Sequence, residues 1–289
     1  MCFELTAEEV QRVVSWTKLK DGSQRAFYSW PCAEPSAVEA SLLIVPGLGE
    51  HGGRYEQCAS FFEGRELDVY AIDLIGHGLS PGMRGCIESY EGVLNEIEAA
   101  SEAILARSPQ LPLVLWGHSM GGNLVLNYLL RKGRLPICAI ASGPMLRAAR
   151  PPGPSFMWFA RKLAILWPNF QLKTPVHYSD CTRDPVQIER MTSDRLFHKQ
   201  VSLRLGAALI DSGEWAIEHA SELKTPLLLI HSAQDAITSA AASKEFAAKC
   251  KAVCELRILP DNLHDLHRDL NSEVILQSMR DWIIEHSNH

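Results

Sequence analysis

The sequence predicts an α/β fold built around a mostly parallel central sheet. Three observations lead to this prediction: short apolar runs recur along the chain, helix-like segments separate several of them, and one serine lies where a strand, a tight turn and a helix meet. The apolar runs lack clean alternation, as expected for strands that are buried on both faces. Strands that alternate with helices imply parallel pairing with right-handed crossovers.

The first predicted element is a β-hairpin. Its two segments, "RVVSWTK" and "RAFYSW", are rich in β-branched and aromatic residues, and Asp21-Gly22 between them is a turn signal. The segment 90–108 has apolar residues at helical spacing and predicts a long helix. The remaining strands are predicted at residues 41–45, 67–73, 111–116, 137–142, 226–231 and 254–259.

Residues 144–221 interrupt this alternation. The segment opens with the proline- and glycine-rich "ARPPGPS" and continues with a dense apolar and aromatic stretch at 155–170. We expect it to form a helical cap over one end of the sheet. The cap would be inserted between two parts of the core, residues 1–143 and 222–289.

Bulk composition limits the function classes that remain open. The chain has 289 residues, of which 46% are hydrophobic and 21% charged, as in soluble globular proteins. Its net charge of -6 argues against nucleic acid as the main partner. The first residues lack a signal-peptide pattern and no apolar run is long enough to span a bilayer. We therefore expect a cytoplasmic protein, peripheral to membranes at most, whose eight cysteines are free thiols.

The sequence "GHSMG" at 117–121 has the G-x-S-x-G pattern of a nucleophile elbow. An apolar strand precedes it and a helix-like stretch follows, which is the order that the elbow requires. A serine hydroxyl needs a neighbouring base to become a good nucleophile. We expect Ser119 to be the nucleophile; the alternative is an ordinary strand-to-helix loop.

The same arrangement predicts an acid and then a histidine, each after a later strand. Asp235 follows the strand at 226–231 closely, and we expect it to be the acid. The last strand is followed by "PDNLHDLHRDL", which holds two histidines. His264 lies nearer the strand and is the favoured base over His267. A metal site at these two histidines is the alternative, although no carboxylate-rich partner site is evident.

An oxyanion hole needs two N–H donors directed at the reacting oxygen. One is expected from Met120, the residue after the nucleophile, and the other from the loop "VPGLGEHGGRY" at 45–55, where Leu48 is the best candidate. A plain glycine-rich loop is the alternative. His77 in "GHG" could act as a second base, but a structural role for it is favoured.

With these motifs in place, the chain resembles the monoacylglycerol lipase and lysophospholipase branch of the α/β-hydrolase family. The resemblance rests on "GLGEHGGRY", "IDLIGHGLSPG", "GHSMGG", "SAQD" and "LHDLHRDL", and extends from about residue 41 to the C-terminal helix. It implies the α/β-hydrolase fold with an inserted helical cap, and the triad and oxyanion donors named above.

The resemblance also implies a substrate and the residues that bind it. Members have an apolar acyl tunnel under the cap and a polar pocket for glycerol, at which Glu50, Arg54 and His267 would act. A solvent-exposed i, i+4 ion pair is the alternative for Glu50 and Arg54. The family often has histidine where this chain has Pro46, which leaves the hydrogen bonding of the oxyanion loop open.

We therefore expect a serine esterase that needs no cofactor or metal and acts on an acylglycerol or similar lipid ester. The alternatives are a lysophospholipase, thioesterase or general carboxylesterase, which a panel of head groups would separate, and a non-catalytic lipid-binding protein, which would not react with a fluorophosphonate. The apolar stretch at 155–170 would either pack onto the sheet or make transient contact with a membrane surface.

Overall fold

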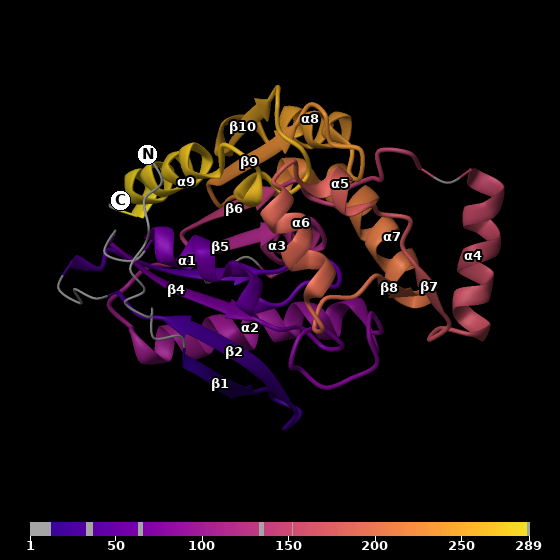
Figure 1. The fold of residues 1–289 in the computed structure, drawn as a ribbon, viewed down its shortest axis with the longest axis horizontal. Helices are drawn as coiled ribbons and strands as arrows, with labels where there is room; N and C mark the ends of the chain where they lie inside the picture. Colours follow the sequence, from indigo (N-terminus) through magenta and orange to yellow (C-terminus); the bar gives the residue numbers. More distant parts are fainter. Residues whose placement is uncertain (1–12, 33–36, 63–65, 133–135, 152, 288–289) are drawn as a thin grey trace.

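The computed structural model describes residues 13–32, 37–62, 66–132, 136–151 and 153–287, so the opening of the chain, with Cys2, lies outside the described residues. An eight-stranded sheet crosses the centre of this part of the chain (Figure 1). Its first two pairings are antiparallel and the others are parallel, which confirms the predicted hairpin and sheet. In spatial order the strands are β1 (Val13–Lys18), β2 (Gln24–Trp30), β4 (Leu67–Ile72), β3 (Ala40–Val45), β5 (Leu113–His118), β6 (Cys138–Ser142), β9 (Leu227–Ser232) and β10 (Cys254–Leu259).

The central strand β5 begins and ends two residues later than the sequence predicts. Pro112, which has no N–H to donate, precedes the first strand residue, Leu113. At the other end Gly117 pairs with Ala141, and His118 pairs with Ser142 of β6. Ser119 therefore follows directly after a fully paired strand, which holds its backbone in place.

Helices cover both faces of the sheet, and each layer closes one hydrophobic core. On one face lie α1 (Glu56–Phe62) and α9 (Ser272–Ser287), packed against Trp116 and its neighbours. On the other face lie α2 (Tyr90–Arg107), α3 (Met120–Arg131) and α8 (Ala240–Lys249). The predicted helix at 90–108 is α2, and the Ser89 hydroxyl caps it by accepting from the N–H of Gly92.

Between β6 and β9 the chain leaves the sheet and forms a separate group of elements. In order they are α4 (Pro154–Leu166), β7 (Gln171–Lys173), α5 (Tyr178–Cys181), α6 (Pro185–Ser193), β8 (Gln200–Ser202) and α7 (Leu203–His219).

The long helix α7 joins this group to the core. Its Leu209 and Ser212 carbonyls accept from the side chains of Asn123 and Asn127 on α3, at 3.2 and 3.1 Å. A methyl group on Gly213 would lie 2.1 Å from the Leu146 carbonyl oxygen, so α7 also lies close to the chain that leaves β6.

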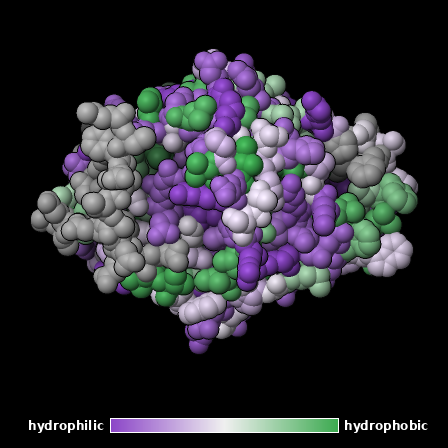
Figure 2. Space-filling model, in the orientation of Figure 1, coloured by the Kyte–Doolittle hydropathy of each residue, from purple (hydrophilic) through white to green (hydrophobic). Residues whose placement is uncertain are grey.

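Helix α4 lies at the outer edge of the molecule, at the right of Figure 1. Much of its surface is apolar and exposed: Trp158 is 63% exposed and Ile165 75%, and Phe159, Leu166 and the following Trp167 are also exposed. Figure 2 shows hydrophobic residues gathered at this end of the molecule. Among the described helices, none is long and apolar enough to cross a membrane. The cysteines that the structure describes are all free thiols, as predicted.

Candidate active site

Ser119 lies in the sharp turn between β5 and α3, with φ 54° and ψ −114°. Positive φ is unusual for serine and marks a backbone that the surrounding structure holds in a strained conformation. The flanking glycines are required by close contacts. A methyl group on Gly117 would lie 2.2 Å from the Gly121 carbonyl oxygen, and one on Gly121 would lie 1.9 Å from that of Val45.

Asp235 and His264 form a short hydrogen bond beside this turn. The Nδ1–H of His264 donates to Oδ2 of Asp235 at 2.6 Å. Asp235 also accepts from the N–H groups of Ile237 and Thr238, each at 2.8 Å, and from the Thr238 hydroxyl at 2.8 Å. This set of donors fixes the carboxylate, and the carboxylate in turn orients the imidazole.

The electrostatics of this pair favour the charged forms. Burial opposes the charge on Asp235, but the neighbouring His264 and His231 hold the pKa of its carboxyl far below the usual range. Burial also opposes a proton on His264, yet the Asp235 carboxylate more than offsets it and raises the pKa of His264 to about 9. The Nε2 of His231 lies 3.3 Å from Asp235 Oδ2, and the sequence did not predict this second histidine beside the carboxylate.

The glycine loop at 45–55 lies directly against Ser119. A methyl group on Gly47 would be 3.4 Å from Cβ of Ser119, so Leu48 follows a residue in contact with the serine. The loop is a tight turn in which the N–H of Glu50 donates to the Gly47 carbonyl and Gly47 N–H donates to the Glu50 carboxylate. Within the described residues, the N–H groups of Leu48 and Met120 donate to no backbone carbonyl, as donors to an oxyanion require.

The loop, the turn at Ser119 and the imidazole of His264 all line one cavity of about 700 Å³. Its core side is lined by Leu48, Ser119, Met120 and His264, which are the predicted nucleophile, base and oxyanion donors. The segment between β6 and β9 supplies an apolar wall, with Val176, Met191, Phe197, Val201, Leu209 and Ile210. Asp235 does not line the cavity and is bonded to the Nδ1 of His264.

Glu50 is the centre of a buried charge cluster. Its carboxylate accepts from Arg268 at 2.5 Å, Tyr55 at 2.8 Å, Arg54 at 3.0 Å and Gly47 N–H at 3.1 Å. Burial opposes its charge, but the guanidinium groups of Arg268 and Arg54 hold its pKa well below the ordinary value. Glu50 lines the cavity, and its pairing with Arg54 is buried, which differs from the exposed ion pair considered above.

Arg54 and His267 do not line the cavity. Arg54 lies over the Phe197 ring and points toward Asp194. His267 is buried and stacked on Tyr55, with ring centroids 5.1 Å apart, and its pKa is lowered well below the ordinary value by burial and by Arg268. Their positions therefore give no support to the predicted contact with substrate.

His77 lies in a buried turn outside the cavity. Its Nδ1 is 2.9 Å from the Ile75 carbonyl oxygen, and burial lowers its pKa to about 3. These contacts fit the structural role that the sequence favoured.

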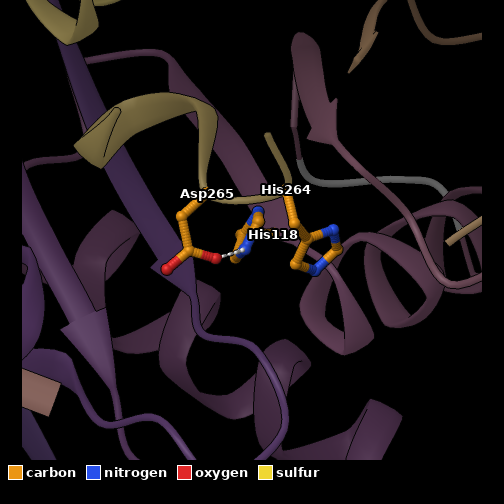
Figure 3. Close-up of side chains that lie close together, drawn as sticks. All are labelled: His118, His264 and Asp265. Carbon is orange, nitrogen blue, oxygen red and sulfur yellow. Dashed lines mark hydrogen bonds and ion pairs between the residues drawn. The ribbon is translucent and has the colours of Figure 1, made fainter. Parts of the chain in front are cut away.

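Sequence reasoning missed a second histidine–carboxylate pair. His118 and Asp265 are hydrogen-bonded beside His264, with His118 Nε2 3.2 Å from Asp265 Oδ1 (Figure 3). The three residues each offer a donor atom within 4.8 Å of the others, a spacing that a metal ion could use, whereas His267 is outside this group. Here His118 and Asp265 bind each other and His264 Nδ1 binds Asp235, so direct hydrogen bonds account for the arrangement.

Comparison with known proteins agrees with the observed fold. The family model described as "Hydrolase_4: Serine aminopeptidase, S33" matches residues 36–271. An uncharacterised abhydrolase domain-containing protein of Dictyostelium discoideum is 29% identical over 85% of this chain, which spans 26% of that protein's length. The monoacylglycerol lipase of Mycolicibacterium smegmatis is 28% identical, over 92% of this chain and 95% of its own. The crystal structure of Paleococcus ferrophilus monoacylglycerol lipase has a TM-score of 0.79 and 26% identity, and the match covers 96% of this chain and 99% of that one.

Proposed function

This chain belongs to the Hydrolase_4 family described as "Serine aminopeptidase, S33", and we propose that within this family it is a serine esterase. Its proposed reaction is the hydrolysis of monoacylglycerols to a fatty acid and glycerol. One observation carries the proposal. Ser119, His264 and the two oxyanion donors line the same cavity as a wall of apolar side chains, which suits an acyl chain whose ester lies at the serine. The relatives named monoacylglycerol lipase support this substrate class.

In the proposed mechanism, Ser119 Oγ attacks the ester carbonyl carbon while His264 takes the hydroxyl proton. The carbonyl oxygen becomes an oxyanion that accepts hydrogen bonds from the N–H groups of Leu48 and Met120. The bond to glycerol then breaks, and His264 returns its proton to the departing alkoxide. Water next attacks the acyl-enzyme by the same steps and releases the fatty acid. Asp235 holds the imidazole and stabilises its positive charge throughout.

The test is covalent labelling followed by a substrate panel. A fluorophosphonate should label the wild-type protein, and neither Ser119→Ala nor a heat-denatured sample should react. Turnover should fall by about 10⁴-fold or more in Ser119→Ala and in His264→Ala, as for other triads. His267→Ala is the matched control, and greater loss in that variant than in His264→Ala would overturn the choice of base.

The panel decides among ester classes. A 1-monoacylglycerol, a lysophosphatidylcholine, an acyl-CoA, a fatty acid methyl ester and an aminoacyl p-nitroanilide should be compared by kcat/KM. We expect the monoacylglycerol to be the best substrate. A higher value for the lysophospholipid or thioester would reassign the enzyme within the family, and absence of labelling and turnover together would favour a lipid-binding protein.

We further propose that residues 144–221 act as a cap and that α4 contacts the lipid surface from which the substrate comes. Support comes from the exposed apolar side chains of Trp158, Phe159 and Ile165. Lys162 lies on the same helix, with its ammonium 5.7 Å from the centre of the Trp158 ring. Arg161 is paired with Asp211 of α7. An apolar helix face with a cation beside it suits an interface that contains anionic lipids.

A further inference from the structure

His118 and Asp265 occupy related positions in the two loops that carry the proposed chemistry. His118 directly precedes Ser119 at the end of β5, and Asp265 directly follows His264. Their hydrogen bond therefore joins the nucleophile turn to the histidine loop one residue away from each reacting side chain (Figure 3). These residues are 147 positions apart in the sequence, so the bond is a tertiary constraint.

His118 is buried and in contact with several neighbouring side chains and one backbone carbonyl. It is 1% exposed, and its Nδ1 lies 3.1 Å from the carbonyl oxygen of Ser142 on the neighbouring strand β6. Its ring contacts those of His264 and His267, with centroid distances of 4.9 and 4.7 Å. A side chain packed in this way can serve as a fixed point for the loop that it binds.

Asp265 extends the connection beyond this pair. Its N–H donates to the Cys181 carbonyl at 2.8 Å, which attaches the histidine loop to α5. Its Oδ2 lies 3.5 Å from the Arg268 guanidinium, which bonds Glu50, and Glu50 accepts from Gly47 N–H. Buried hydrogen bonds and ion pairs thus link the histidine loop to both the nucleophile turn and the oxyanion loop.

We propose that His118 and Asp265 are positioning residues that set the placement of His264 relative to Ser119. The proposal rests on the proposed function, because it matters for catalysis only if Ser119 and His264 react together. Proton transfer requires the two side chains to be within hydrogen-bond reach, and a displacement of about 1 Å can cost on the order of 10²-fold in rate. Loss of the bond between His118 and Asp265 would let the histidine loop move relative to Ser119.

The first experiment removes the bond in two ways. Asp265→Leu cannot accept from His118, whereas the amide oxygen of Asp265→Asn still can. We expect Asp265→Leu to lower kcat by roughly 10- to 100-fold with KM little changed, and Asp265→Asn to retain most of the wild-type rate at its own pH optimum. Asp269→Asn is the matched control, since Asp269 is a buried carboxylate of the same loop that binds Arg183 and Leu263 N–H. Equal kcat losses in Asp265→Leu and Asp265→Asn would overturn the proposal, because only the Asn variant keeps an acceptor for His118.

A pH profile separates positioning from simple stabilisation. The ionisable groups that face His264 are Asp235 after β9, Asp265 in its own loop, Glu50 after β3 and His118 at the end of β5. The negative charge of Asp265 helps to raise the pKa of His264. Because the base must be neutral, Asp265→Asn should move the acidic limb of kcat/KM to lower pH, and Asp269→Asn should leave it in place. An unmoved limb in Asp265→Asn would count against the proposal.

A double-mutant cycle tests whether the pair acts as a unit. His118→Phe keeps a ring at this position and removes both nitrogen atoms. We expect His118→Phe combined with Asp265→Leu to lose little more kcat than the worse single variant, whereas multiplying losses would mean that the residues act separately. Fluorophosphonate labelling of the wild-type protein keeps the two proposals distinct. Failure of wild-type labelling defeats the proposed function, whereas normal labelling with unaffected variants defeats only the positioning role.

Discussion

At the residue scale, the protonation state of the proposed base, His264, depends on one buried carboxylate, that of Asp235. Burial opposes the charge on Asp235, but His264 and His231 hold the pKa of its carboxyl far below the usual range, so Asp235 remains ionised. Two backbone N–H groups and the Thr238 hydroxyl also donate to this carboxylate. An ionised partner at 2.6 Å stabilises the protonated form of His264. The arrangement strengthens the imidazole as a proton acceptor, and it also keeps the imidazole protonated over more of the pH range.

The pKa of about 9 for His264 predicts the direction of the pH dependence. Below this pKa the imidazole is mostly protonated and cannot accept the Ser119 proton, so kcat/KM should rise with pH through the neutral range into the alkaline range. The limb should lie above the ordinary histidine pKa of about 6.5. A profile measured on a short soluble ester in constant ionic strength checks this, and a limb below pH 6.5 would contradict the assignment.

Glu50 carries a second residue-scale prediction. Its carboxylate is already bonded to Gly47 N–H, Tyr55, Arg54 and Arg268, and we expect its main contribution to be a well-placed oxyanion loop. Glu50→Gln should therefore lower kcat for a glycerol ester and for the methyl ester of the same acid by similar factors. A hydrogen bond to a charged group is worth about 1.5–3 kcal/mol, so a selective loss of that size for the glycerol ester would instead indicate direct contact with glycerol.

At the scale of elements, the turn between β5 and α3 works only because two segments approach closely. Helix α3 begins at Met120, and its first turn lies against the carbonyl oxygens at the end of β3. The contact leaves no room for a side chain at Gly121, and it brings the glycine loop at 45–55, which follows β3, next to Ser119. The glycines of the G-x-S-x-G pattern are thus needed for close packing, in addition to any chemical role of the serine.

Substitution of Gly121 tests this requirement. A methyl group 1.9 Å from the Val45 carbonyl oxygen forces β3 and α3 apart, so Gly121→Ala should lower the free energy of unfolding by about 3 kcal/mol, the upper end for overpacked sites. Activity should fall as well, because the oxyanion loop moves with β3. Gly153→Ala is the control, since a methyl group there meets no atom within 4 Å. Urea unfolding followed by circular dichroism measures both, and equal stabilities would refute the argument.

The helix α4 gives an element-scale prediction about interfaces. If its exposed side chains contact lipid, Trp158→Ser and Phe159→Ser should weaken binding to anionic liposomes and slow hydrolysis of long-chain emulsions. They should spare hydrolysis of a short soluble ester, because neither residue lines the cavity. Co-sedimentation and parallel assays on the two substrates check this. Equal losses on both substrates, or a lower unfolding temperature, would mean that these side chains are needed for folding.

At the scale of the whole molecule, patterns that are local in the sequence were predictable and contacts between distant segments were not. Apolar runs located six strands of the central sheet, and runs of β-branched and aromatic residues located the hairpin. The order of Ser119, Asp235 and His264 along the chain also pointed to residues that lie together, because Ser119 and His264 line one cavity and His264 bonds Asp235. The bond between His118 and Asp265 spans 147 positions, and that between Glu50 and Arg268 spans 218. No spacing rule relates such pairs, because only the finished sheet brings their strand ends together.

The contact between Gly49 and His198 has a consequence for how this protein can change over evolution or by design. The backbone N–H of His198 donates to the Gly49 carbonyl, and a methyl group on Gly49 would lie 1.7 Å from the His198 carbonyl oxygen. The loop at 45–55 and residues 144–221 are therefore in close main-chain contact at this point. A chimera that exchanges residues 144–221 for those of a relative inherits a loop fitted to a different partner. Specificity in this architecture should be easier to alter by single substitutions along the cavity wall than by exchanging residues 144–221 as a unit.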